Sequence, residues 1–225
     1  MARILMAALT ALAALFGTAA AAASDERPPP ELRPGSDDPS TMIVALHPAG
    51  STGAEFADEL PFDGWAARDG VLMVYPNGTP VPGRPGLHWN AGRGFPATGD
   101  DAGYLADLIA LLRSQWPSVR RVAVYGQSQG AVMVYRLLCE HPDAADAAAL
   151  RSGSVAIDAC VRVPSTLHWH GANDTVVPRD GGYRFWPLWK VKRIPGVTLR
   201  VFPDAEHRGP FPGWEWASWR WATAG

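Results

Sequence analysis

The chain has 225 residues, of which 47% are hydrophobic, and a formal net charge of −2; this length suits one medium-sized domain better than two. The near-neutral charge, without long runs of lysine or arginine, excludes nucleic-acid binding as the main task. The chain has no Cys-x-x-Cys or His-x-x-x-His pair and no Gly-x-x-x-x-Gly-Lys loop, so we expect neither a metal site nor a cofactor.

The N-terminal stretch "MARILMAALTALAALFGTAAAAASDE" contains one arginine, then an apolar run, then small residues before a polar stretch. This order predicts a secretory signal peptide over residues 1–23, and therefore a secreted or periplasmic protein. A retained membrane anchor is the alternative. The apolar part is short for a span of about 20 residues, so we expect no membrane span in the mature protein.

Export to an oxidising compartment permits a disulfide, and the chain has two cysteines, Cys139 and Cys160. Their pairing would close a loop of about 20 residues, which is worth roughly 3 kcal/mol on the chain-entropy model. Cys139 can equally be a buried thiol on a helix, so both possibilities stay open here.

Residues 24–40, "SDERPPPELRPGSDDPS", are rich in proline and charge, which predicts a flexible leader before a catalytic domain over 41–225. The apolar run 42–46 indicates the first buried strand, with a glycine-containing loop after it. A second apolar strand within 70–78 ends in Pro-Asn-Gly.

Residues 76–99 contain six glycines and five prolines, which predicts a long loop of the kind that is usually functional or mobile. The next stretch has apolar residues at helical spacing. Asp100 and Asp101 stand at its start as caps and Pro117 stops it, so a helix is expected between them.

The stretch "VAVYGQSQGAVMVYRLL" (122–138) changes from a valine-rich strand pattern to helical spacing at Ser128. Gly126 and Gly130 stand two residues to either side of this serine. A nucleophile held on a sharp strand-to-helix turn needs such small neighbours, because the turn brings the flanking backbones close together.

Three later segments, 147–154, 165–174 and 197–207, read as strands, and the four tryptophans of "GWEWASWRWATAG" suggest a closing helix. Strands that alternate with helices predict an α/β fold, with a mostly parallel, doubly wound sheet flanked by helices. Function in such sheets gathers at the carboxyl ends of the strands.

Ser128, Asp174 and His207 all lie just past predicted strand ends. A serine hydroxyl becomes a useful nucleophile when a base takes its proton and a third group orients that base. The order Ser, Asp, His along the chain is that of the α/β-hydrolase fold. Three other acids compete for the third role: Asp158, Asp204 and Glu206.

Six blocks occur in the order and rough spacing of one family: "LHPAG", "VYPNG", "WNAG…DDAGYL", "GQSQGAVMVYRLLCEHPD", "HGANDTVVP" and "AEH". Over roughly residues 41 to 221 the chain resembles the secreted polyhydroxybutyrate depolymerase and feruloyl/acetylxylan esterase family of α/β-hydrolases. The resemblance implies the α/β-hydrolase fold, with Ser128 as nucleophile, His207 as base and Asp174 as the acid that orients it.

An oxyanion hole needs two backbone N–H donors. One should be the N–H of Gln129, directly after the nucleophile. The other should come from the loop after the first strand, where the family usually has His-Gly and this chain has His47-Pro48. Proline has no N–H, so Ala49 is the better candidate.

Two further departures from the family pattern are present. After His207 the chain reads Arg208-Gly209-Pro210 instead of a Thr-Trp-Pro-like stretch, and no appended substrate-binding domain or linker is found.

His47, Trp89 and Asn90 are candidates for lining the substrate pocket. Loop bracing by His47 and simple packing of Trp89 and Asn90 are the competing interpretations.

These observations predict a secreted serine esterase whose partner is an ester substrate, possibly polymeric. The resemblance implies a polyhydroxyalkanoate-type polyester or short acyl esters as substrate. A feruloyl or acetylxylan esterase is the alternative within catalysis. A non-catalytic binding protein that keeps the fold and has lost the oxyanion hole is the alternative from another class. The oligomeric state is left open.

Overall fold

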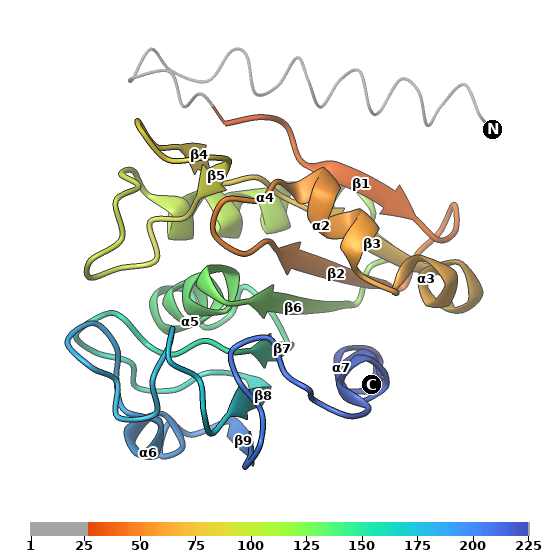
Figure 1. The fold of residues 1–225 in the computed structure, drawn as a ribbon. Helices are drawn as coiled ribbons and strands as arrows, with labels where there is room; N and C mark the ends of the chain where they lie inside the picture. Colours follow the sequence, from red (N-terminus) through yellow and green to blue (C-terminus); the bar gives the residue numbers. More distant parts are fainter. Residues whose placement is uncertain (1–26, 225) are drawn as a thin grey trace.

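The computed structural model describes residues 27–224, and its centre is a seven-stranded sheet in the order β1-β3-β2-β6-β7-β8-β9 (Figure 1). The strands are β1 (Glu31–Pro34), β2 (Thr41–Leu46), β3 (Val71–Tyr75), β6 (Arg121–Gln127), β7 (Ala147–Arg151), β8 (Ser165–Gly171) and β9 (Val197–Phe202). Every neighbouring pair is parallel except β1 and β3. A short hairpin of β4 (Thr79–Pro80) and β5 (Leu87–His88) lies outside this sheet.

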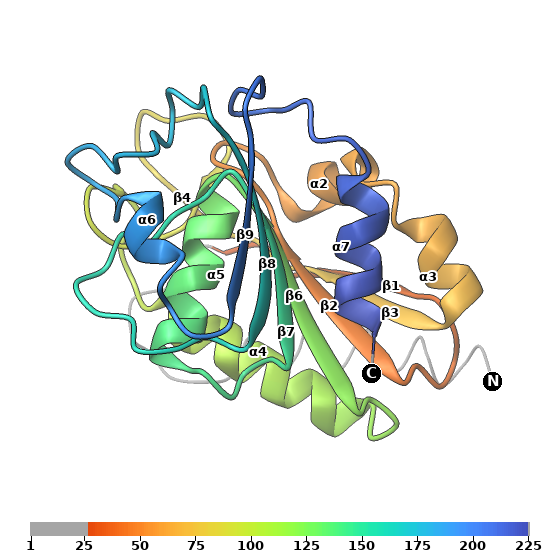
Figure 2. The same ribbon diagram turned by 90° about the horizontal axis from the view of Figure 1, so that it is seen from below.

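Helices cover both faces of the sheet (Figure 2). One layer contains α4 (Asp101–Gln115), α5 (Gln129–Glu140) and α6 (Leu188–Val191); the other contains α2 (Gly53–Glu59), α3 (Asp63–Asp69) and α7 (Trp214–Thr223). Strand β2 shows why two layers are needed: Met42, Val44 and Leu46 join the apolar cluster beneath α4 and α5, whereas Ile43 and Ala45 join the opposite cluster. Burial on both faces explains the continuous apolar runs of the sequence.

The helix expected after residue 99 and the closing tryptophan helix are both present, as α4 and α7. Asp100 caps α4 by accepting a hydrogen bond from the N–H of Gly103. Asp101 does not act as a cap, because its carboxylate is buried and paired with Arg27. In α7, Trp214 and Trp219 are buried against the sheet, whereas Trp216 is 46% exposed.

The prediction that residues 24–40 form a flexible leader is wrong for most of that segment. Residues 31–34 form β1, which pairs antiparallel with β3. Upstream of β1, the Arg27 guanidinium donates to Asp101 Oδ1 at 2.5 Å and to the carbonyl oxygen of Asn77 at 2.8 Å. Proline content marks a segment without helix, but an edge strand tolerates proline because one of its sides needs no N–H donor.

Cys139, near the end of α5, and Cys160, in the loop after β7, form a disulfide. This cross-link ties the helix that follows Ser128 to the connection between β7 and β8. The predicted signal peptide, residues 1–23, lies outside the described residues. Between residues 27 and 224, every helix is too short or too polar to cross a bilayer.

The buried pair between Arg27 and Asp101 leads to a stability prediction. The two side chains are only 6% and 0% exposed, so Arg27→Met leaves a buried carboxylate without its cation. We expect the free energy of unfolding to fall by about 3 kcal/mol, measured by urea denaturation with tryptophan fluorescence. Arg120→Met, at an exposed position, is the matched control and should change it by less than about 0.5 kcal/mol. Equal effects of the two variants would contradict a structural role for Arg27.

Candidate active site

Ser128 lies on the turn between β6 and α5, with φ 54° and ψ −120°. A non-glycine residue rarely adopts this conformation, so the surrounding structure must hold it. The flanking glycines explain how: a Cβ on Gly126 would lie 2.7 Å from the carbonyl carbon of Gly130, and one on Gly130 would lie 2.1 Å from the carbonyl oxygen of Leu46. The expectation that this turn needs small neighbours is thus met by direct backbone contact.

The structure brings together the three side chains that the sequence places after separate strands. The Ser128 hydroxyl lies 2.9 Å from His207 Nε2, and His207 Nδ1 lies 2.8 Å from Asp174 Oδ2. Asp174 follows β8 and His207 follows β9. With Nδ1–H donating to the carboxylate, Nε2 is the free base that faces the hydroxyl, which is the arrangement that proton transfer from serine requires.

The environment of Asp174 keeps it ionised. Its Oδ1 accepts hydrogen bonds from the backbone N–H groups of Val176 and Val177, at 2.9 and 2.8 Å. Burial by itself raises the pKa of Asp174, but the hydrogen bonds from His207 and Val177 outweigh burial, and the pKa is lowered. Of the competing acids, Asp158 is on the surface, where it pairs with Arg93.

Ser152, which the sequence did not single out, holds the backbone of His207. Its hydroxyl donates to the carbonyl oxygen of His207 at 2.6 Å, and its φ is 55°. The residue is fully buried at the end of β7, between the strands that carry Ser128 and Asp174. Nothing local in "RSGS" distinguishes it from a turn serine.

A buried row of polar rings lies behind Asp174. The Tyr135 hydroxyl is 2.9 Å from His168 Nδ1, and His168 Nε2 is 3.2 Å from His170 Nδ1. His170 Nε2 is 2.9 Å from the carbonyl oxygen of Val177 and 3.4 Å from Asp174 Oδ2. A carbonyl only accepts, so Nε2 of His170 carries the proton of that ring and its Nδ1 accepts. His168 Nε2–H then donates to His170 Nδ1, and the Tyr135 hydroxyl donates to His168 Nδ1. Burial lowers the pKa of both histidines, which are neutral.

The two candidate oxyanion donors lie on the same pocket as Ser128. Gln129 is the first residue of α5, and Ala49 is in the loop after β2; both line the pocket. Among the described residues, neither backbone N–H donates a hydrogen bond to a protein group. The loop of Ala49 is held by Gly50, whose N–H donates to the carbonyl oxygen of Leu87 at 2.9 Å.

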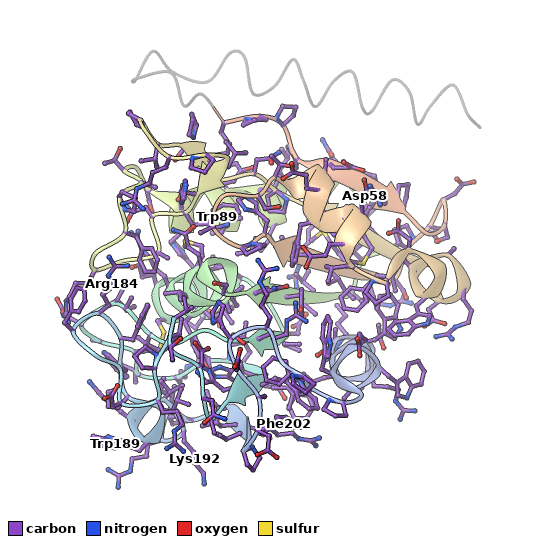
Figure 3. The ribbon with its side chains drawn as sticks, viewed as in Figure 1. Asp58, Trp89, Arg184, Trp189, Lys192 and Phe202 are labelled. Carbon is purple, nitrogen blue, oxygen red and sulfur yellow. A yellow bond between two sulfur atoms is a disulfide. The ribbon has the colours of Figure 1, made fainter. Side chains whose placement is uncertain are left out.

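For His47 and Trp89 the structure confirms the competing interpretations, loop bracing and packing, in place of pocket lining. His47 is fully buried; its Nδ1–H donates to the carbonyl oxygen of Pro48, and its Nε2 accepts from the N–H of Gly78 at 3.0 Å. Trp89 is also fully buried inside the molecule (Figure 3), and its indole N–H donates to the carbonyl oxygen of His47. These side chains brace the loops, because their polar groups find partners inside the protein.

Asn90 borders a different hollow, away from Ser128. The pocket beside Ser128 has a volume of about 170 Å³. The loop of residues 76–99 does contribute to it, as the sequence predicts, but through other residues: Arg84, His88, Gly94, Phe95 and Pro96. The loop after β8 supplies a second group: Val176, Val177, Arg184 and Phe185. Over residues 27–224, no group of three or more His, Cys, Asp or Glu side chains is placed to hold a metal ion.

Comparison with solved structures agrees with this architecture. An esterase designated PE8 matches with a TM-score of 0.66 at 22% identity, over 84% of this chain and 95% of that one. A carboxylesterase from Mesorhizobium loti gives 0.64 at 18%, over 85% and 93%. An acetyl xylan esterase from Aspergillus awamori gives 0.62 at 16%, over 84% and 92%. No protein-family model and no curated protein sequence matches the chain. The chain therefore has the α/β-hydrolase fold, as the sequence predicts.

The neutral buried histidines lead to a pH prediction. Burial lowers the pKa of His47 from 6.5 to about 4. Between pH about 6.5 and 4, His47 is therefore protonated in the unfolded chain and neutral in the folded protein. The contribution of neutral His47 to the free energy of unfolding is fully present above pH about 6.5. It is lost as the pH falls toward 4, by about 3 kcal/mol. The lowered pKa values of His168, His170 and Asp174 act in the same direction.

Urea denaturation between pH 4 and 8 measures this dependence. His47→Gln keeps a donor and an acceptor but does not titrate, so its free energy of unfolding should vary less steeply with pH than that of the wild type. Its value at pH 8 reports any loss of packing separately. An unchanged pH slope would show that folding does not shift the pKa of His47 and would contradict this prediction.

Proposed function

We propose that the protein is a serine carboxylic ester hydrolase in which Ser128 is the nucleophile, His207 the base and Asp174 the orienting acid. The single observation that carries this proposal is the continuous hydrogen-bonded row from Asp174 through His207 to Ser128, at 2.8 and 2.9 Å. This row opens on a pocket beside two unengaged backbone N–H groups. The similarity to esterases supports the fold on which this chemistry is proposed.

In the first half of the reaction, the Ser128 oxygen attacks the ester carbonyl carbon and its proton passes to His207 Nε2. The carbonyl oxygen becomes an oxyanion, which the N–H groups of Gln129 and Ala49 stabilise. The imidazolium forms beside the ionised Asp174. When the tetrahedral intermediate collapses, His207 gives the proton to the leaving alcohol, and the acyl group stays on Ser128.

In the second half, water attacks the acyl-enzyme carbonyl and loses its proton to His207. A second oxyanion forms in the same place, between Gln129 and Ala49. Its collapse breaks the bond to Ser128, and His207 returns the proton to the serine oxygen. The carboxylic acid leaves, and the enzyme has its starting protonation state.

The proposed substrates are short-chain acyl esters or the ester bonds of a polyhydroxyalkanoate-type polyester, with export to the periplasm or the medium. The pocket volume of about 170 Å³ favours a short acyl chain. Acetyl or feruloyl esters of plant cell walls are the second candidate. The similarity to an acetyl xylan esterase supports that candidate at the level of fold.

A non-catalytic binding protein is the alternative from a different class, because Pro48 removes one N–H from the loop where a donor is needed. Ala49, the next residue, has an N–H and borders the pocket, which favours catalysis. A fluorophosphonate probe discriminates the two functions: it labels an activated serine in an enzyme and leaves a binding protein unlabelled.

Hydrolysis of p-nitrophenyl esters by the mature protein tests the proposal. Ser128→Ala should lower kcat/KM by at least about 10³-fold, because the nucleophile is lost while the fold is kept. Ser118→Ala is the matched control, since its hydroxyl donates to the carbonyl oxygen of Pro39, away from the pocket. Equal rates for the wild type and Ser128→Ala would refute the serine mechanism.

The pocket size gives a prediction about acyl chain length. A cavity of about 170 Å³ has room for a few carbon atoms beyond the carbonyl, so kcat/KM for p-nitrophenyl acetate and butyrate should exceed that for the octanoate. The same assay, run over the series of esters, measures this preference. A maximum at octanoate would show that the acyl chain lies outside this pocket.

A further inference from the structure

Two arginines border the pocket that contains Ser128. Arg84 comes from the loop of residues 76–99, and Arg184 comes from the loop after β8. Figure 3 shows Arg184 at the side of the molecule where these two loops face each other. Among the described residues that line this pocket, none is aspartate or glutamate. The space beside the proposed nucleophile is therefore positively charged.

Arg184 is held in place although it has no acidic partner. A Cβ on Gly94 would lie 2.9 Å from Arg184 Nε and 3.3 Å from its Cδ. The Arg184 side chain therefore packs against the backbone of this glycine, in the space that a side chain at position 94 would need. Its guanidinium is 5.9 Å from the ring centre of Phe95 and 5.2 Å from that of Tyr183. Within residues 27–224, Arg184 Nε is buried without a hydrogen-bond partner.

Some arginines of the chain are paired with acids. Arg27 binds Asp101, and Arg136 binds Glu140. In contrast, neither Arg84 nor Arg184 forms an ion pair with a residue in the described part of the chain. A partly desolvated guanidinium without an acceptor loses hydrogen bonds to water and gains none in return. A ligand that supplies an anionic acceptor recovers them.

We propose that the substrate carries a carboxylate close to its scissile ester bond and that Arg184, assisted by Arg84, binds this carboxylate. This inference rests on the proposed function of Ser128. A guanidinium is a planar fork that matches the two oxygens of a carboxylate, and such charge-assisted pairs are strong where water is partly excluded. A pocket of about 170 Å³ admits a short acid of this kind together with the ester carbonyl.

The carboxylate can belong to either side of the ester. On the acyl side, the substrate is a half-ester of a dicarboxylic acid. On the alcohol side, it is an acylated hydroxy acid, such as the free end of a hydroxy-acid chain. Both present the same chemistry to Arg184, and two pairs of substrates separate them.

In the acyl pair, monoethyl succinate is compared with ethyl succinamate; in the alcohol pair, 3-acetoxybutanoate is compared with 3-acetoxybutanamide. Each pair differs only by carboxylate against neutral amide. Release of acid is followed by pH-stat at low salt. In one pair at least, kcat/KM should be about tenfold to a hundredfold higher for the carboxylate, as expected for a charge-assisted contact. Added salt should reduce this ratio.

Variants assign the preference to the arginines. Arg184→Met should lower the ratio of the two kcat/KM values at least about tenfold, and Arg84→Met should lower it less, because Arg84 is exposed. Arg184→Lys keeps the charge without the fork and should give an intermediate ratio. Arg120→Met, before β6, should leave the ratio at the wild-type value. If both members of both pairs are hydrolysed at equal rates, this inference is refuted and the proposed function stands.

If no ester is hydrolysed, the proposed function fails, and binding then decides the inference. Succinate should raise the Tm of Ser128→Ala, whereas succinamide should not, because only the dianion can pair with the arginines. The rise should disappear in the Ser128→Ala, Arg184→Met double variant. No difference between succinate and succinamide would overturn carboxylate binding.

Discussion

The close contact of three backbone segments around Ser128 is the constraint on which the rest of the site depends. Gly130, at the start of α5, lies against the carbonyl oxygen of Leu46, at the end of β2, and Gly126 lies against Gly130. No side chain fits at either glycine. This contact places the N-terminus of α5 at the carboxyl end of the sheet. It also holds Ser128 in the strained backbone conformation that exposes a serine hydroxyl at a strand-to-helix turn. Gln129, the next residue, then lines the same pocket as Ser128.

The proposed acid is positioned by a second, polar constraint. Asp174 is surrounded by donors from its own loop and from His207, and His170 approaches it from behind. The row from Tyr135 to His170 links α5, which positions Ser128, to the loop that positions Asp174. Because each ring has one donor and one acceptor engaged, the tautomers are determined and the acid has little freedom to turn. Buried polar rows of this kind specify one geometry when every member is satisfied.

The long glycine- and proline-rich loop has two tasks. Through β5 it pairs with the loop that carries Ala49: Gly50 and Ser51 exchange backbone hydrogen bonds with Leu87. Beyond that pairing, it supplies one wall of the pocket, including Arg84 and Gly94, the glycine against which the Arg184 side chain packs. The same segment therefore shapes the proposed oxyanion donor and sets the charge of the space in front of it.

The sequence alone determined the α/β class and the places of Ser128, Asp174 and His207 after their strands, because strand and helix periodicity and the flanking glycines are local patterns. It did not reveal α2, α3 or the edge strand β1, which are short and depend on partners far along the chain. It left pocket lining and loop bracing or packing open for His47, Trp89 and Asn90, and the structure decided that His47 and Trp89 are braces within the interior and that Asn90 borders another hollow. Only the tertiary structure decided that Ser152 holds His207, that Cys139 pairs with Cys160, and that two arginines without an ion pair line the pocket of Ser128. Each of these relations joins residues from separate loops, and the distance between separate loops is set by packing of the whole domain, which no local pattern encodes.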